Sequence, residues 1–342
     1  MKLQIFLYAL WGFLWAGYFA LDGLDFGVGV LFAVLGRGSA ERRLMLNSIG
    51  PVWNGNEVWL LGAGAITFAA FPAAYASIFS SFYLLFVILV GALILRGVVF
   101  EFRGSLQSAG WTGIWDAAFT LGSIIPAFLF GIVFGNIFRG LAMGSGGFQG
   151  SFLSFFNPYS LLTGVLFLAL FSYHGAVWLA AKTGGGMQRK AESAAVAGWF
   201  VLLAVCAVFA VYTGYDTRMF DNYVNHPAWW LVPALLVVSL AASGYFLLRR
   251  QNLAAFLASG LTVALTVFFG IVGLYPDLLP SRTDGRYSVT LANAAASDYA
   301  LWLMAGLLVI FLPLIIGYQL WVYGLFRGRL LEEEVAADED AY

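Results

Sequence analysis

Residues 4–35 read QIFLYALWGFLWAGYFALDGLDFGVGVLFAVL, an apolar stretch that the carboxylates of Asp22 and Asp25 interrupt. About 20 apolar residues let an α-helix cross the hydrocarbon core of a bilayer, so this stretch predicts a membrane-spanning helix. Acidic side chains are costly inside such a helix and commonly mark function. Because Asp22 and Asp25 are three positions apart, they lie on nearly the same helix face. They could therefore share a water molecule, a proton or a cation.

The composition of the whole chain is that of a membrane protein. Hydrophobic residues make up 61% of it and charged residues 10%, with a mean hydropathy of +0.86, whereas about a quarter of the residues of a soluble domain are charged. Nine stretches are long and apolar enough to span a membrane, namely residues 4–35, 51–72, 74–100, 114–138, 158–182, 192–214, 228–248, 253–275 and 298–326. Such unbroken runs disfavour a β-barrel, whose strands alternate over about 10 residues. We predict an all-α polytopic membrane protein with a single transmembrane helical domain at 1–327 and an acidic, solvated cytoplasmic tail at 328–342.

The distribution of basic residues predicts the orientation of the chain. Most of the 17 Lys and Arg residues fall in alternate loops, beginning with residues 36–50, and cytoplasmic loops are the ones that retain Lys and Arg. We therefore expect the N-terminus outside and the C-terminus in the cytoplasm, which agrees with an odd number of spans.

A second polar segment, Gly50-Pro-Val-Trp-Asn-Gly-Asn-Glu-Val-Trp59, opens the second predicted helix. Pro51 suits a first helical turn, where its missing N–H costs nothing. Asn54 and Glu57 are three positions apart and share a face. Three further residues support the motif. Trp53 and Trp59 can anchor the helix near the membrane surface, and the amide of Asn56 adds a polar group.

The acids within the predicted helices have two possible roles, proton transfer and structural support. Burial and a neighbouring carboxylate both favour the protonated form of an acid, so Asp22, Asp25 and Glu57 could exchange protons as a relay. Alternatively, each is a hydrogen-bonded structural group that holds helices together. Three acids on two consecutive helices favour the relay, given the cost of burying them.

Several motifs together resemble one known family, subunit II of the cytochrome bd-type quinol oxidases, which are respiratory terminal oxidases that reduce dioxygen to water. The matching segments, in order, are Asp22-Gly-Leu-Asp-Phe-Gly-Val-Gly29, Glu41-Arg-Arg-Leu-Met-Leu-Asn-Ser-Ile-Gly-Pro51, Trp53-Asn-Gly-Asn-Glu-Val-Trp59, Phe68-Ala-Ala-Phe-Pro72 with Tyr75, Gly122-Ser-Ile-Ile-Pro126, Phe134-Gly-Asn136 and Asn157-Pro-Tyr159. They concentrate in residues 15–180, and the last third agrees mainly in hydropathy and helix number.

The resemblance implies an architecture and a set of partners. It implies two four-helix bundles with one extra helix, and a location in the bacterial cytoplasmic (inner) membrane. It also implies that haems b and d and the quinol-oxidising loop belong to a haem-bearing subunit I, so that this chain binds none of the haems, contains no catalytic residue and serves to stabilise that partner. Some members of the family hold a structural quinone in subunit II, which nothing in this sequence locates.

One departure from the family pattern concerns the proton path. Family members commonly carry an Asp at the position of Asn54, where it is regarded as part of a proton path, and they often carry Gln at the position of Glu57. An Asn cannot relay protons by ionising. Our hypothesis is therefore that protons enter from the cytoplasm near Glu57 and pass through Asp25 and Asp22 toward the partner subunit.

Two other polar residues lie in predicted helices. His174 is the only intramembrane histidine, and a lone histidine on an apolar helix is more often a hydrogen-bonded core residue than a haem ligand. Arg96 lies near the end of the third predicted helix, where we expect an interfacial charge that reaches water. Alternatively, Arg96 pairs with a carboxylate of subunit I or with a lipid head group.

The alternative function is a proton-coupled secondary transporter whose acids in the first helix bind the coupling ion. Transporters tend to contain inverted repeats around a midplane site, and the acid motif has no second copy in the other half of this chain. A purely structural role is the third reading.

Overall fold

The computed structural model describes residues 1–106 and 108–337 and is built almost entirely of helices. The long helices are α1 (Lys2–Leu35), α3 (Trp53–Ala70), α5 (Tyr83–Phe102), α6 (Ala109–Arg139), α7 (Pro158–Lys182), α8 (Gly185–Asp216), α10 (Leu231–Leu248), α11 (Asn252–Leu274) and α13 (Asp298–Leu325). The shorter ones are α2 (Ser39–Ile49), α4 (Pro72–Ser81), α9 (Met219–Asn225), α12 (Leu291–Ala294) and α14 (Glu332–Ala337). Two small antiparallel ribbons, β1 (Met143–Gly144) with β2 (Gly147–Phe148) and β3 (Asp277–Leu279) with β4 (Val289–Thr290), lie in loops at one end.

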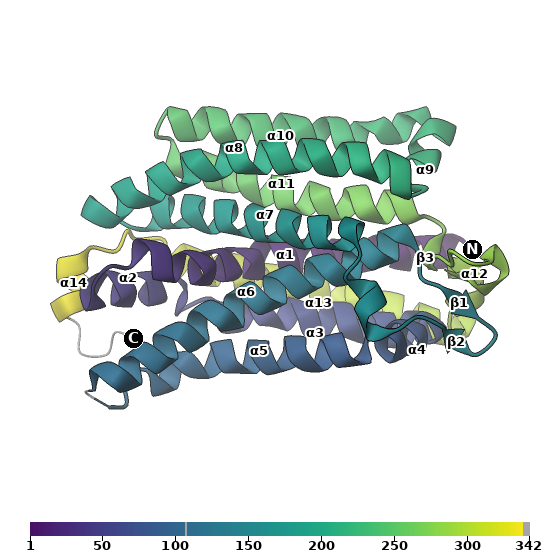
Figure 1. Cartoon of the computed structure of the whole chain (residues 1–342), viewed down its shortest axis with the longest axis horizontal. Coiled ribbons are helices and arrows are strands. Elements are labelled where there is room, and N and C mark those ends of the chain that lie inside the picture. The colour runs from purple at the N-terminus through teal and green to yellow at the C-terminus, as the bar shows by residue number, and fades with distance from the viewer. Residues whose placement is uncertain (107, 338–342) are drawn as a thin grey trace.

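The long helices form two four-helix bundles and one additional helix (Figure 1). Helices α1, α3, α5 and α6 form the first bundle, and α7, α8, α10 and α11 form the second. Helix α1 lies between them, because it packs on α7 and α11 as well as on its own bundle. Helix α13 lies outside both bundles, against α3 and α1. The expected architecture of two bundles plus one helix is confirmed.

Glycines bring α1 and α7 into close contact. A Cβ atom on Gly27 would lie 1.9 Å from the carbonyl oxygen of Phe171, and one on Gly175 would lie 2.4 Å from the carbonyl carbon of Gly27. No larger residue fits at either position without displacing backbone. Small residues are the usual means of close helix packing in membranes, and Gly27 belongs to the same motif as Asp22 and Asp25.

The predicted number of spans agrees with the structure, but one predicted helix is wrong. In the described residues eight helices are long and apolar enough to span a membrane, and the total is nine if the bent pair α3 and α4 is counted as one span. The stretch 74–100, predicted as one helix, is divided into α4 and α5, and α4 is bent by 120° from α3. The stretch is divided at Phe82, which lies between the end of α4 and the start of α5. The bend between α3 and α4 falls at Phe71, which precedes Pro72 and has φ −132° and ψ 61°, because a residue before proline is disfavoured in the α conformation.

The C-terminal segment, predicted as a solvated acidic tail, keeps Glu333 and Glu334 exposed but also packs on the rest of the chain. The backbone N–H of Leu330 donates to the carbonyl of Lys182 at 2.8 Å, and that of Gly184 donates to the carbonyl of Leu330 at 3.0 Å. Val335 of α14 is buried, and α14 packs on α2. This segment therefore covers one end of the molecule up to residue 337, while the rest of the predicted tail lies outside the described residues.

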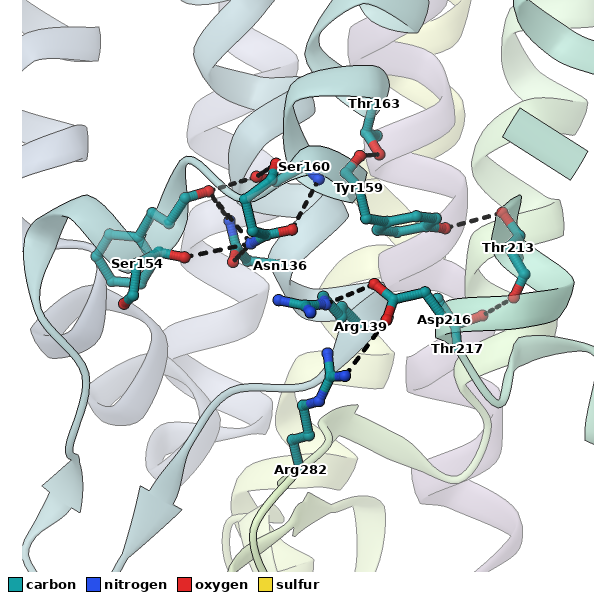
Figure 2. Close-up of polar contacts among 12 residues, drawn as sticks. Asn136, Arg139, Ser154, Tyr159, Ser160, Thr163, Thr213, Asp216, Thr217 and Arg282 are labelled. Carbon is teal, nitrogen blue, oxygen red and sulfur yellow. Dashed lines mark hydrogen bonds and ion pairs between the residues drawn. The ribbon is translucent and has the colours of Figure 1, made fainter. Parts of the chain in front are cut away.

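At the opposite end, an ion-pair cluster connects the two bundles to a loop (Figure 2). Asp216 at the end of α8 accepts from Arg139 of α6 at 2.6 Å and from Arg282 of the loop after β3 at 3.3 Å. Nearby, the hydroxyl groups of Tyr159 and Thr213 are 2.9 Å apart and join α7 to α8. These contacts hold the ends of α6, α7 and α8 together at this end of the molecule.

Candidate functional site

A buried arginine joins acids from two helices. Nη2 of Arg96 on α5 lies 2.7 Å from Oδ1 of Asp22 on α1 and 2.6 Å from Oε1 of Glu57 on α3. The side chain of Arg96 is 1% exposed and that of Asp22 is fully buried, whereas that of Glu57 is 28% exposed. The guanidinium also lies over the ring of Phe26, 4.4 Å from its centroid. Three helices of the first bundle thus meet at one cation.

The expectation that Arg96 is an interfacial charge that reaches water is wrong. Helix α5 continues for six residues beyond Arg96 to Phe102, which is about 9 Å at 1.5 Å per residue, so the guanidinium lies inside the bundle. Its partners are acids of this chain. The signal was available in the sequence, since an arginine in an apolar helix requires an acidic partner and unpaired acids stood in two other helices.

Asp25 is held by an amide rather than by a cation. Nδ2 of Asn56 on α3 donates to Oδ2 of Asp25 at 2.9 Å. Oδ1 of Asn56 accepts from Nε2 of Gln319 at 2.7 Å and from the hydroxyl of Tyr323 at 3.0 Å, both on α13. Asn56 thereby connects α1, α3 and α13. We call the following set the acid cluster: Asp22, Asp25, Asn56, Glu57, Arg96, Gln319 and Tyr323.

Asn54, which the sequence placed on the proton path, lies outside the acid cluster. Its side chain is exposed, while that of Asn56 is buried. Two positions along a helix correspond to a rotation of about 200°, so the two amides point to different sides of α3. The structure therefore brings together Asp22, Asp25 and Glu57. The amide that contacts Asp25 is that of Asn56, and Asn54 does not take part.

The two tryptophans of the motif differ from each other in their surroundings. Trp53 is half-buried and stacks on Phe100 of α5, with ring centroids 4.9 Å apart. Trp59, expected near the membrane surface, is buried against α1 instead, since a Cβ atom on Gly17 would lie 2.4 Å from its ring. Both rings pack α3 against its neighbours and so hold Asn56 and Glu57 in place.

Several buried polar atoms of this region have no hydrogen-bond partner among the described residues. They are Oδ2 of Asp22, Oδ1 of Asp25, Nη1 of Arg96 and the hydroxyl of Tyr18. Buried polar atoms in proteins are nearly always satisfied, often by ordered water. The unpaired hydrogen-bonding atoms of the acid cluster therefore belong to its two aspartates and its arginine.

His174 has both ring nitrogens engaged. Nδ1 lies 2.7 Å from Oγ of Ser259 on α11, and Nε2 lies 3.0 Å from the carbonyl oxygen of Ala20 on α1. The ring is fully buried and stacks on Phe256. The geometry is that of a core histidine that joins α1, α7 and α11.

A second charge cluster, centred on the buried Asp116, lies near the α2 end of the molecule. Asp116 of α6 accepts from Arg42 at 2.6 Å and from Arg103 at 2.7 Å. Arg42 also donates to the carbonyl of Gly36 at 2.9 Å. Asp116 therefore ties the segments that follow α1 and α5 to the start of α6.

An apolar cavity of about 470 Å³ lies between the bundles and is lined by residues of α1, α3 to α8 and α11. Aromatic side chains form much of its wall, among them Trp15, Phe19 and Phe130. Its few polar groups include the indole N–H of Trp11, which donates to Thr67 at 2.7 Å. The indole nitrogen of Trp15 is buried and has no partner among the described residues.

Comparison with known proteins gives consistent matches along the chain. The sequence model of the family "Cytochrome bd terminal oxidase subunit II" matches residues 3–326. Cytochrome bd ubiquinol oxidase subunit 2 of Bacillus subtilis is 37% identical over 325 residues, covering 94% of this chain and 95% of the relative. Cytochrome bd-I ubiquinol oxidase subunit 2 of Escherichia coli is 31% identical over 367 residues, covering 97% and 96%. In fold, a chain of the bd oxidase from Geobacillus thermodenitrificans matches with a TM-score of 0.76 at 18% identity, covering 95% of this chain and 99% of that one.

Proposed function

The chain belongs to the cytochrome bd terminal oxidase subunit II family, and on that premise we propose that its acid cluster forms part of a proton path into the oxidase. As a member of this family, the chain is a subunit of an oxidoreductase complex that contains haem and a partner subunit. The alternative of a proton-coupled transporter is not supported. The proposal concerns what this chain contributes to the complex.

The charge count of the acid cluster supports a role in proton transfer. The cluster contains three carboxylates and one guanidinium: Asp22 and Glu57 contact Arg96, whereas Asp25 accepts from the amide of Asn56. An unpaired buried charge is expensive, so one cation does not stabilise three ionised acids at once. Such a cluster exchanges protons with its surroundings more readily than a balanced ion pair does. This excess of acids over bases is the observation that carries the proposal.

The exposures of the acids suggest a direction. Glu57 is the only partly exposed carboxylate of the cluster, and the two aspartates are fully buried. We propose that protons enter near Glu57 and pass through Asp25 and Asp22 toward the partner subunit. Arg96 connects Glu57 to Asp22, and Asp25 lies one helical turn from Asp22. The proposal includes the orientation predicted from the basic residues, with the N-terminus outside and the C-terminus in the cytoplasm of a bacterium.

The cofactors belong to the same proposal. We infer that haems b and d reside in the partner, subunit I, and that this chain stabilises it; the engagement of both His174 nitrogens supports this assignment. We also infer that the apolar cavity takes a structural quinone. Its aromatic wall suits an isoprenoid chain, and the unpartnered indole N–H of Trp15 suits a quinone carbonyl.

The decisive experiment measures oxygen consumption and proton uptake together, in liposomes that contain the complete oxidase. Glu57→Gln and Asp25→Asn are expected to slow proton uptake and quinol-driven oxygen consumption by about 100-fold or more, which is the lower end of the range for a single proton-transfer group. Glu101→Gln is the matched control, because Glu101 is an exposed carboxylate of α5 outside the cluster. Full rates in the Glu57 and Asp25 variants, with haem content unchanged, would refute the proton path.

A further inference from the structure

A groove that no part of the proposed function uses lies where the end of α1 meets the start of α8. It has a volume of about 510 Å³. Its lining comes from the last turn of α1, the loop that follows it and the first turns of α8, and consists of Val34, Leu35, Arg37, Arg189, Lys190, Ser193 and Ala194. Three of these residues carry positive charge and none carries negative charge. The groove is thus a basic pocket whose lining also includes the apolar residues Val34, Leu35 and Ala194.

The positive charge of the groove is only partly neutralised by the chain itself. The ammonium of Lys190 forms an ion pair with Glu41 of α2, whose other carboxylate oxygen accepts from the backbone N–H of Arg37 at 2.9 Å. Burial opposes the charge on Glu41, but the hydrogen bonds from Lys190 and Arg37 outweigh burial and lower its pKa. The guanidinium groups of Arg37 and Arg189 are exposed and take part in none of the ion pairs of the described residues.

An apolar strip leads from this groove along the membrane-facing side of α8. Starting from Ser193, exposed residues recur at Ala197, Phe200, Val201 and Ala204, which is the spacing of one helix face. From Ser193 to Ala204 the helix rises about 16 Å, close to half of the hydrocarbon thickness of about 30 Å. The strip therefore extends through one leaflet of a bilayer.

We propose that this groove binds the phosphate of an anionic phospholipid through Arg37, Arg189 and Ser193, with an acyl chain lying along the exposed strip of α8. The two arginines supply charge-assisted donors in the fork geometry that suits phosphate. The adjacent strip distinguishes a lipid from a free anion, because a free anion gains nothing from an apolar surface. Basic pockets between helices at the cytoplasmic membrane surface are typical sites for acidic lipid head groups, and this end of the molecule is the one predicted to face the cytoplasm.

The test is a lipid-binding measurement on the complete oxidase. The purified complex is incorporated into nanodiscs of phosphatidylcholine with a minor share of phosphatidylglycerol, and the lipid retained on this chain is quantified by native mass spectrometry. The double variant Arg37→Gln/Arg189→Gln is expected to retain phosphatidylglycerol about 30-fold more weakly. The control Arg249→Gln/Arg250→Gln removes the same charge at the turn between α10 and α11, which does not line the groove, and is expected to bind like the wild type.

Four outcomes would overturn the proposal. Equal loss of lipid in the control would mean that only the overall surface charge matters. Displacement of the lipid by millimolar inorganic phosphate, or equal retention of phosphatidylcholine, would mean that the groove does not select an anionic lipid. Cross-linking of Ser193→Cys to another subunit would assign the groove to a protein interface. None of these outcomes depends on the oxidase rate, so they leave the proton path untouched.

Discussion

Arg96 on α5 and Asp22 on α1 form an ion pair that is shielded from solvent on every side, with 2.7 Å between Nη2 and Oδ1. Removal of one partner of such a pair costs about 3–5 kcal/mol, because the other charge stays buried and unpaired. We predict that Arg96→Met sharply lowers the yield of the assembled, haem-containing complex and its thermal stability. The measurements are the haem absorption of the purified complex and its melting temperature.

The double variant Arg96→Met/Asp22→Asn supplies the control for this pair. It removes both charges of the contact, so it is expected to recover part of the lost stability, as coupled residues do in a double-mutant cycle. Glu57 prevents full recovery, since its carboxylate also loses its partner. If the two single variants were simply additive, Arg96 and Asp22 would not interact in the complex.

Close packing of α1 on α7 gives a second prediction. Gly27→Ala places a methyl group 1.9 Å from the carbonyl oxygen of Phe171, so the helices must separate. Overpacking of this kind typically costs about 1–3 kcal/mol, and we expect a lower melting temperature together with lower oxidase activity. Gly91→Ala on α5 is the control, because nothing lies within 4 Å of its added Cβ. Equal stability of the two variants would contradict the observed approach of the helices.

The position of Asn56 predicts a graded effect. Tyr323→Phe removes one of two hydrogen bonds to Oδ1 of Asn56, and a single hydrogen bond is worth about 0.5–1.5 kcal/mol. Asn56→Leu removes the partner of Asp25 and Gln319 as well, so we expect a much larger loss of proton uptake than for Tyr323→Phe. The rates of proton uptake in liposomes decide the order. The reverse order would place the functional group on α13 rather than on α3.

The ion pair between Glu41 and Lys190 predicts a dependence of stability on pH. The pKa of Glu41 is lowered below its ordinary value of 4.5 in the folded chain, so its contribution is fully present above about pH 4.5 and is lost as the pH falls through the lower folded value. The pair is partly exposed, so the contribution is small, about 0.2–1 kcal/mol. We expect wild type to melt above Glu41→Gln at pH 7 and the difference to vanish in acid. A difference that grows in acid would contradict this sign.

Local features of the sequence were enough for much of the fold. Hydropathy located nine spans because each span is a contiguous run that meets the same apolar solvent. The same rule marked Asp22, Asp25 and Glu57 as exceptional. The predicted boundary between the stretches 51–72 and 74–100 agrees with the bend before α4, where Pro72 disfavours a helical conformation for Phe71. The second break, at Phe82 between α4 and α5, has no proline beside it and was missed.

Side-chain contacts between different helices could not be predicted from local sequence in the same way. Arg96 and Asp22 are 74 positions apart, and Asn56 and Gln319 are 263 apart, so no local pattern pairs them. Asn54 and Asn56 are both amides on one helix, and only the direction in which α3 faces α1 decides which of them meets Asp25. The acidic segment after α13 is solvated by composition, yet its backbone pairs with Lys182 and Gly184.

The sequence by itself determined that this chain crosses a membrane many times and that acids lie within its helices, because hydropathy and charge are properties of each segment alone. The tertiary structure decided that Arg96 is the counter-ion, that Asn56 rather than Asn54 holds Asp25, and that Glu57 is the partly exposed carboxylate of the cluster. These outcomes depend on how α1, α3, α5 and α13 are rotated against one another. Helix rotation is set by the packing of whole faces, such as Gly27 on Gly175 and Trp59 on Gly17, and not by any single segment.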